Sequence, residues 1–160
     1  MKLRGLIAED FVNYKIPSLF LACTTCDWKC CTERGADPSL CQNKPLASAP
    51  VIDITDEGIY SMFSSNSISK AVVVGGLEPM LQFDELDHLI ATFRNHGEMC
   101  DFVLYTGYYP EEIQRETSVL ARHKNVIIKY GRYIPGRPSV YDDVLGVELS
   151  SDNQFARRIS

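Results

Sequence analysis

Short apolar runs alternate with amphipathic segments along most of this chain, and this alternation limits its possible folds more than any other feature. The runs are rich in β-branched and aromatic residues, as is typical of buried strands: Ser18–Ala22, Ala71–Gly75, Asp101–Tyr105 and Asn125–Lys129. Residues 144–149 are predicted to form one more strand. Helices are predicted to begin at Thr55 and at Pro110 and to span Asp84–Asn95, where apolar residues recur at helical spacing.

Strands separated by helical segments predict an α/β fold with a mainly parallel sheet of about five or six strands. A closed eightfold barrel needs about 250 residues, whereas this chain has 160. A partial (β/α) barrel or an open sheet is therefore expected. Residues 1–160 are expected to form a single domain, which is large enough to fold without disulfides or structural metals.

In parallel α/β folds, functional residues gather at the carboxyl ends of the strands. Four segments of this chain directly follow predicted strands: the segment from Cys23, the segment from Gly75, Thr106–Gly107 and Tyr130–Arg132. We therefore expect these four segments to lie on one edge of the sheet and to contain the functional site.

Five of the six cysteines lie between Cys23 and Cys41, in a polar segment rich in turn-forming residues. Cysteines that only fill a core are scattered, and Cys100 is expected to be a buried thiol of that kind. In a reducing compartment, clustered cysteines favour a metal site over disulfides. Cys23, Cys26, Cys31 and Cys41 could supply the four ligands of a zinc ion, whereas an iron–sulfur cluster can use three thiolates and leave one iron open. The spacing alone does not decide between these two metals.

Charge and hydropathy exclude several classes of partner. The net charge is −5, and an acidic chain has no general attraction for nucleic acid. Four arginines near the C-terminal end are expected on a solvated face: Arg132, Arg137, Arg157 and Arg158. Lys2 and Arg4 are followed by acids rather than by a long apolar core, so no signal peptide is expected. The apolar stretch Leu19–Cys23 is too short to cross a membrane, and a cytoplasmic protein without membrane contact is predicted.

Several motifs together resemble one enzyme family. The spacing of Cys26 and Cys30, the segment Leu40–Asn43 around Cys41, and the glycine-rich segment Gly75–Pro79 are similar to the cysteine motif and the methionine-binding motif of the radical S-adenosylmethionine (radical-SAM) enzymes. Within these enzymes, the chain most resembles the activating proteins of anaerobic ribonucleotide reductase. The resemblance covers residues 19–154, through three further segments: 104–108, 128–134 and 149–154.

This resemblance implies a partial barrel of the radical-SAM type and a [4Fe–4S] cluster in a loop at residues 23–45, with three ligands: Cys26, Cys30 and Cys41. S-adenosylmethionine would bind the open iron and yield a 5′-deoxyadenosyl radical. The residues implied to contact S-adenosylmethionine are Leu40 at the adenine, Gly75, Gly76 and Glu78 at the methionine end, and Tyr105 and Thr106 near the ribose or sulfonium. The implied activity is formation of a glycyl radical on a partner such as anaerobic ribonucleotide reductase, with a flavodoxin-like electron donor.

The sequence departs from the family pattern at three places. Ten residues separate Cys30 from Cys41 where the family usually has two, Leu77 is inserted into the glycine motif, and Cys23 and Cys31 are additional thiols. A longer surface loop costs little, but Cys23 or Cys31 could replace one of the expected ligands. Two other functions stay open: radical-SAM modification of another peptide or protein, and a zinc-binding adaptor without catalysis.

Overall fold

A six-stranded sheet forms the centre of the molecule in the computed structural model, which describes residues 1–160. Its strands are β2 Gly5–Asp10, β3 Ser18–Ala22, β5 Ala71–Gly75, β6 Asp101–Tyr105, β7 Val126–Tyr130 and β10 Phe155–Arg158. They lie in the order β10-β7-β6-β5-β3-β2. The four central strands are parallel, and the strand at each edge, β2 or β10, is antiparallel to its neighbour.

Four of the predicted strands are confirmed, with β3, β5 and β6 at the predicted bounds and β7 one residue further along the chain. Across the sheet, Leu21 pairs with Val74, Val74 with Leu104, and Leu104 with Ile128. These strands are covered on both faces, which explains why each one is a nearly continuous apolar run. Because the strands are parallel, their carboxyl ends lie at the same edge.

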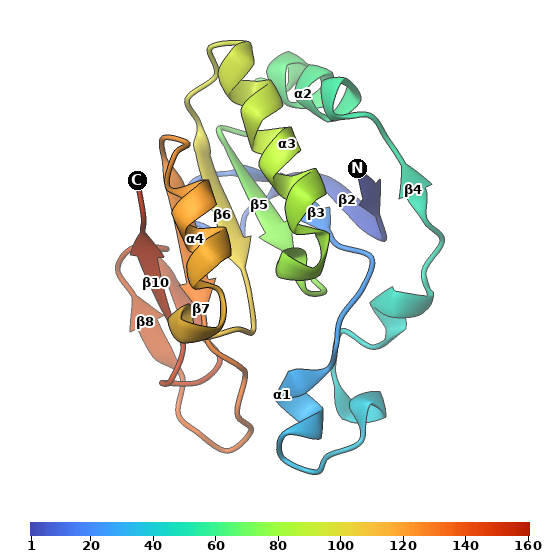
Figure 1. Ribbon diagram of the computed structural model, residues 1–160, viewed down its shortest axis with the longest axis vertical. Helices are drawn as coiled ribbons and strands as arrows, with labels where there is room; N and C mark the ends of the chain where they lie inside the picture. The colour runs from blue at the N-terminus through green and yellow to red at the C-terminus, as the bar shows by residue number, and fades with distance from the viewer.

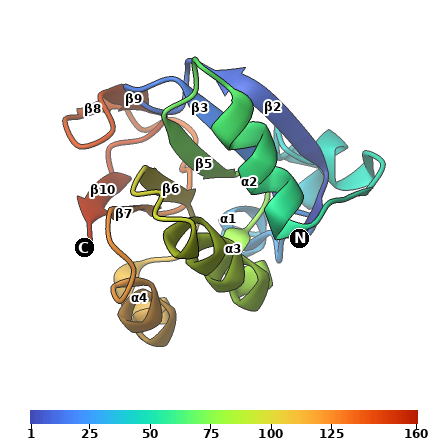
Figure 2. The ribbon, with the colours of Figure 1, turned by 90° about the horizontal axis from the view of Figure 1, so that it is seen from above.

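Three helices cover one face of the sheet (Figures 1 and 2): α2 Asp56–Ser65, α3 Phe83–Asn95 and α4 Gln114–Leu120. Thr55 caps α2 as expected, because its hydroxyl accepts a hydrogen bond from the Gly58 N–H at 3.0 Å. Ile59 and Phe63 on the predicted apolar face of α2 are buried. Met62 was expected on the same face but is exposed, because the stripe through Ile59 and Phe63 leaves it at the edge.

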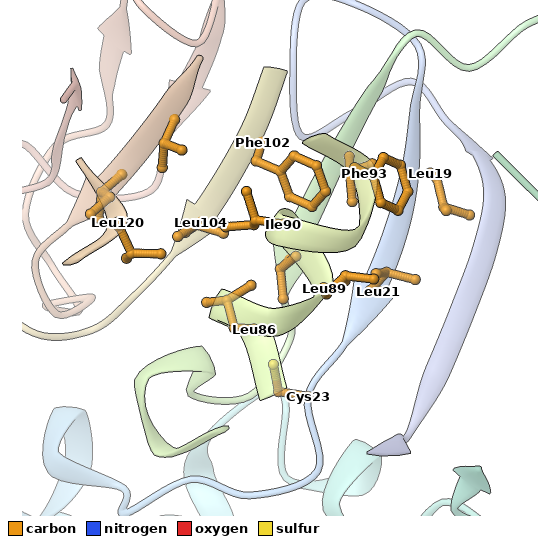
Figure 3. Packing of buried hydrophobic residues seen from close by; sticks show 14 of the residues in the cluster. Leu19, Leu21, Cys23, Leu86, Leu89, Ile90, Phe93, Phe102, Leu104 and Leu120 are labelled. Atoms are coloured by element: carbon orange, nitrogen blue, oxygen red, sulfur yellow. The ribbon is translucent and has the colours of Figure 1, made fainter. Parts of the chain in front are cut away.

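The helices and the sheet enclose a cluster of 22 buried residues (Figure 3). The ring of Phe93 from α3 packs edge-on against Phe102 of β6, with the ring centroids 5.0 Å apart. Leu19 and Leu21 of β3 lie on the same side of the sheet. Removal of this apolar surface from water is the main stabilising contribution to the fold. Cys100 belongs to the cluster, as expected for a structural thiol.

A hairpin covers part of the opposite face of the sheet, on the side away from α3 and α4 (Figure 2). It consists of β8 Val140–Asp142 and β9 Val147–Leu149, which pair antiparallel in a separate two-stranded sheet. The strand predicted over residues 144–149 is therefore only partly right. Residues 143–146 form a turn, in which Gly146 adopts a φ of +71° and its N–H bonds to the Asp142 carbonyl, and the strand begins only at Val147.

The remaining elements are short. β1 Lys2–Leu3 pairs with β4 Ile52–Asp53. The cysteine-rich segment contains the four-residue helix α1 Lys29–Thr32 and two 3₁₀ turns, Pro38–Leu40 and Pro45–Ser48. Two more 3₁₀ turns, Pro79–Gln82 and Pro110–Glu112, come before α3 and α4. The cysteine-rich segment lies beyond the carboxyl edge of the sheet, where α1 appears at the bottom of Figure 1.

The architecture confirms an α/β fold with a mixed, mainly parallel six-stranded sheet. Its assignment to the radical-SAM type of partial barrel, and the assignment of residues 1–160 to a single domain, stay predictions. None of the helices combines the length and the apolar character needed to cross a bilayer.

Candidate functional site

A cavity of about 990 Å³ opens at the carboxyl edge of the sheet. All four segments that follow the parallel strands contribute to its lining, which confirms that they share one edge. Ligand sites in proteins have volumes of about 300–1,000 Å³. The cavity therefore has room for a ligand much larger than a single metal ion.

Four cysteines line this cavity: Cys26, Cys30, Cys31 and Cys41. All six cysteines of the chain are free thiols. Cys23 does not line the cavity, because it is fully buried in the core cluster, where Figure 3 shows it at one end, near Leu86. The structure thus places three expected ligands and Cys31 together, and places Cys23 apart from them.

The backbone of the cysteine-rich segment turns sharply at Trp28, whose φ of 60° lies in the left-handed region. This turn begins α1, and the Cys31 N–H donates to the Trp28 carbonyl at 2.8 Å. The Trp28 N–H donates to Sγ of Cys26 at 3.3 Å. The turn therefore brings Cys26 back toward Cys30 and Cys31, whose sulfur atoms lie 3.8 Å apart.

The thiols in the cavity are difficult to ionise without a metal. Burial raises the pKa of Cys26 to about 11, and burial also raises the pKa of Cys30 to about 12. The contact with the sulfur of Cys31, 3.8 Å away, raises the pKa of Cys30 further. A metal that binds here must displace their protons.

The donor set suits an iron–sulfur cluster. No group of three or more His, Cys, Asp or Glu side chains lies close enough together to hold one metal ion. A structural zinc ion needs four such ligands in a tight tetrahedron. A cluster is held by thiolates bound to different irons, so its ligands stand further apart, and thiolates are the donors that iron–sulfur clusters prefer. Four thiols on the wall of one large cavity therefore suit such a cluster.

The glycine-rich segment after β5 faces the cysteines across the cavity. Gly76 lines the cavity with a φ of +74°, and a Cβ there would lie 2.8 Å from Cδ2 of Leu46 and 3.1 Å from Cβ of Ala22. Gly75 is buried at the end of β5, outside the cavity lining, and its carbonyl accepts a hydrogen bond from the Cys23 N–H at 2.9 Å. A Cβ at Gly75 would lie 3.0 Å from Cβ of Tyr105, so both glycines allow close packing at this edge.

Glu78 joins the ends of two neighbouring strands. Its carboxylate accepts hydrogen bonds from the Thr106 hydroxyl at 2.7 Å, the Gly107 N–H at 2.9 Å and the Met80 N–H at 3.1 Å. Burial raises the pKa of Glu78, and these hydrogen bonds oppose the increase. The Glu78 N–H donates to the Thr25 carbonyl at 2.9 Å, which ties the cysteine-rich segment to the glycine-rich segment.

The other predicted contacts of S-adenosylmethionine also lie on the cavity wall. Tyr105 and Thr106 line it at the end of β6, although the Tyr105 hydroxyl is already bonded to the Asn13 carbonyl and the Thr106 hydroxyl to Glu78. Leu40 lines it from the cysteine-rich segment and is 77% exposed. The structure thus places every predicted site residue except Gly75 on the cavity wall.

Two cationic residues of this cavity were not among the predicted site residues, although Arg132 belongs to a segment that was expected at this edge. Lys129 lies on β7 with 6% of its surface exposed, and its ammonium donates only to the Gly131 carbonyl, at 2.9 Å. Its position as the one charged residue inside the apolar run of β7 was the available signal. Arg132 was expected on a solvated face, but it is also only 6% exposed. This expectation was wrong because Arg132 pairs with Glu33 and Glu112, which are distant in the sequence.

Comparison with known proteins identifies a matching family. The sequence model of the family described as "4Fe-4S single cluster domain" matches residues 18–154, which include every cysteine in the cavity. Neither a curated protein nor a solved structure matches the chain.

Proposed function

The chain belongs to the family of 4Fe-4S single cluster domains, and from this we propose that it is a radical-SAM enzyme that generates a glycyl radical on a partner enzyme. The proposed partner is a glycyl-radical enzyme such as anaerobic ribonucleotide reductase, and a flavodoxin-like protein is proposed as the electron donor. Modification of another peptide or protein by the same chemistry is the nearest alternative.

One observation carries the proposal: the cysteines and the glycine-rich segment line the same cavity, which is large enough for a cluster and a second ligand. Cys26, Cys30 and Cys41 would hold the cluster. A cluster with three protein ligands supplies an open iron and an electron for reductive cleavage of S-adenosylmethionine.

The residues around the cavity would orient the cosubstrate. Gly76 lets the backbone turn tightly at the cavity wall, because a Cβ at this position would meet Leu46 and Ala22. Glu78 keeps the ends of β5 and β6 at a fixed separation through its hydrogen bonds to Thr106 and Gly107. Lys129 supplies a buried positive charge for an anionic group in the cavity.

The mouth of the cavity supports a protein as the substrate. Leu40 and Val12 line the cavity and are 77% and 75% exposed. Exposed apolar side chains beside the cavity would give a partner protein apolar surface to contact. A loop of the partner could thereby reach the cosubstrate.

Anaerobic reconstitution followed by reduction tests the proposal. We expect brown protein with about four irons per chain, and release of 5′-deoxyadenosine and methionine from S-adenosylmethionine when dithionite is added. Incubation with an anaerobic ribonucleotide reductase should then give the electron paramagnetic resonance (EPR) doublet of a glycyl radical. Colourless protein with one tightly bound zinc would contradict the proposed radical-SAM activity. Cleavage of S-adenosylmethionine without a glycyl radical would favour the alternative substrate.

A further inference from the structure

Helix α1, which carries Cys30 and Cys31, has little intrinsic stability. It has only four residues, it begins at Trp28 in the left-handed conformation, and no side chain caps its first turn. Helices this short do not persist by their own hydrogen bonds. Contacts with the rest of the molecule must therefore determine where the helix and its cysteines lie.

Arg132 provides the strongest of these contacts. It follows β7, and its guanidinium donates to both carboxylate oxygens of Glu112, at 2.7 and 2.6 Å. The same guanidinium donates to the Glu33 carboxylate at 2.9 Å. Glu33 is the residue that ends α1. The forked pair with Glu112 fixes the direction of the guanidinium. Its hydrogen bond to Glu33 then joins the end of α1 to the edge of the sheet.

Lys29 holds the other end of α1 to the same acceptor. Its ammonium lies 3.3 Å from the Glu112 carboxylate and 4.4 Å from the centroid of the Tyr108 ring. The Tyr108 hydroxyl in turn donates to Asp27, just before the helix, at 2.6 Å. Both ends of α1 are therefore tied to the segments that follow β6 and β7.

We propose that Arg132 is a positioning residue which, with Glu112, Glu33 and Lys29, sets Cys30 at the cavity for cluster binding. We refer to these four side chains as the Arg132 clasp. The proposal rests on the cluster of the proposed function but not on its substrate. The clasp contains two positive and two negative charges, so its main effect is orientation rather than a net field on the cluster.

Three variants test the clasp by loss of iron to a chelator under anaerobic conditions. We expect Arg132→Met and Glu112→Gln to lose the cluster about tenfold faster than the wild type, as is typical when residues behind metal ligands are changed. Arg132→Lys should lose iron as fast as Arg132→Met does, because an ammonium cannot form the two parallel hydrogen bonds of a guanidinium. The EPR spectrum of the reduced cluster should change shape in all three.

A matched control breaks an arginine–carboxylate pair at the opposite edge of the sheet. Arg158 lies 2.7 Å from Asp101 at the start of β6, and Arg158→Met should retain iron as the wild type does. If Arg132→Met does not fold, as judged by far-UV circular dichroism, Glu33→Gln replaces it. Glu33 has a half-exposed side chain, and we expect this variant to fold and still lose iron faster than the wild type.

Two results would overturn the proposal. Wild-type iron retention and EPR spectra in Glu33→Gln and Glu112→Gln would show that the clasp does not position the cysteines. Opposite shifts of the reduction potential in Arg132→Met and Glu112→Gln, with restoration by Arg132→Lys, would indicate a field effect instead. Faster iron loss in the clasp variants of a protein that does not cleave S-adenosylmethionine would support the clasp and reject the proposed enzyme.

Discussion

In the protein without its iron–sulfur cluster, Lys129 is a charged side chain in a buried position. The side chain lies on β7 with 6% of its surface exposed, and no carboxylate lies within salt-bridge distance. Burial lowers the pKa of Lys129 from 10.5 to about 8. A buried charge without a partner destabilises a fold, so this position serves the cavity rather than stability.

Lys129→Met should stabilise the cluster-free protein by about 3 kcal/mol at pH 7, because burial lowers the pKa of Lys129 from 10.5 to about 8. At that pH both the folded and the unfolded wild type carry the proton, and the folded state alone bears the cost of burying it. Between pH 8 and 10.5 the folded wild type loses the proton while the unfolded chain keeps it. Wild-type stability therefore rises with pH in this window, and the advantage of the variant shrinks. Urea unfolding at a series of pH values measures the difference.

The exposed Lys124 provides the control for this substitution. Lys124→Met should change the free energy of unfolding by less than about 0.5 kcal/mol at every pH. If Lys129→Met instead destabilises the protein at pH 7, the ammonium has a stabilising partner in the folded state, and the argument from burial is wrong.

The cysteines divide into cavity and core groups, and alanine substitutions should separate these groups. Cys26→Ala, Cys30→Ala and Cys41→Ala should each abolish the four-iron content after reconstitution, because each removes a thiolate from the cavity. Cys23→Ala should retain iron and lower stability by about 1 kcal/mol, because it leaves a small void in the core. Iron analysis and urea unfolding report the two effects. A folded Cys23→Ala protein without iron would show that Cys23 is a ligand and not a core residue. Cys100→Ala, which also changes a thiol of the core, serves as the control.

At the scale of elements, the sequence predicted what local pattern alone determines. β3, β5 and β6 lie at their predicted bounds because strands covered on both faces are continuous apolar runs. β2 and β10 were not predicted. β2 is exposed at three of its six positions and ends in two acids, and β10 includes Arg157 and Arg158. Their pairing with β3 and β7, rather than their composition, makes them strands.

The candidate site was predictable to a similar extent. The shared edge followed from the order of strands and helices, because parallel strands end on the same side. The Arg132 clasp did not, because Arg132 and Glu33 are 99 residues apart and meet only in the folded chain. Exclusion of Cys23 from the cavity also needed the structure. Its side chain points to the helix-covered face, and its distance along the chain from Cys26 does not reveal this.

The turn that follows β5 depends on Gly76. Gly76→Ala should destabilise the protein by about 2–3 kcal/mol, since alanine is strained at a φ of +74° and its Cβ would lie 3.1 Å from Cβ of Ala22. Gly97 has a similar φ of +78°, but a Cβ at that position would have no atom within 4 Å. Gly97→Ala should therefore cost only about 1–2 kcal/mol. Equal losses in the two variants, measured by urea unfolding, would show that the contact with Ala22 relaxes freely.

At the scale of the whole molecule, the layers divide stability from function. The two core clusters, of 22 and 8 buried residues, lie on the two faces of the sheet. None of the cysteines proposed to bind iron belongs to either core cluster, although Cys26 packs against the larger core cluster. The cysteine-rich segment projects beyond the sheet (Figure 1). The sheet and helices therefore have a hydrophobic core that does not depend on the iron–sulfur cluster.

Removal of iron should consequently loosen the cysteine-rich segment without unfolding the sheet. We expect the protein stripped by a chelator to keep its far-UV circular dichroism and to unfold cooperatively, at a lower temperature because a ligand that binds the folded state adds stability. In hydrogen exchange, amides of residues 26–44 should exchange faster after iron removal, while amides of β5, β6 and β7 stay protected. Cys41→Ala should give the same pattern without a chelator. Uniform loss of protection across the sheet in either sample would mean that the cluster is required for folding, as in small metal-dependent domains, and that the two cores are insufficient on their own.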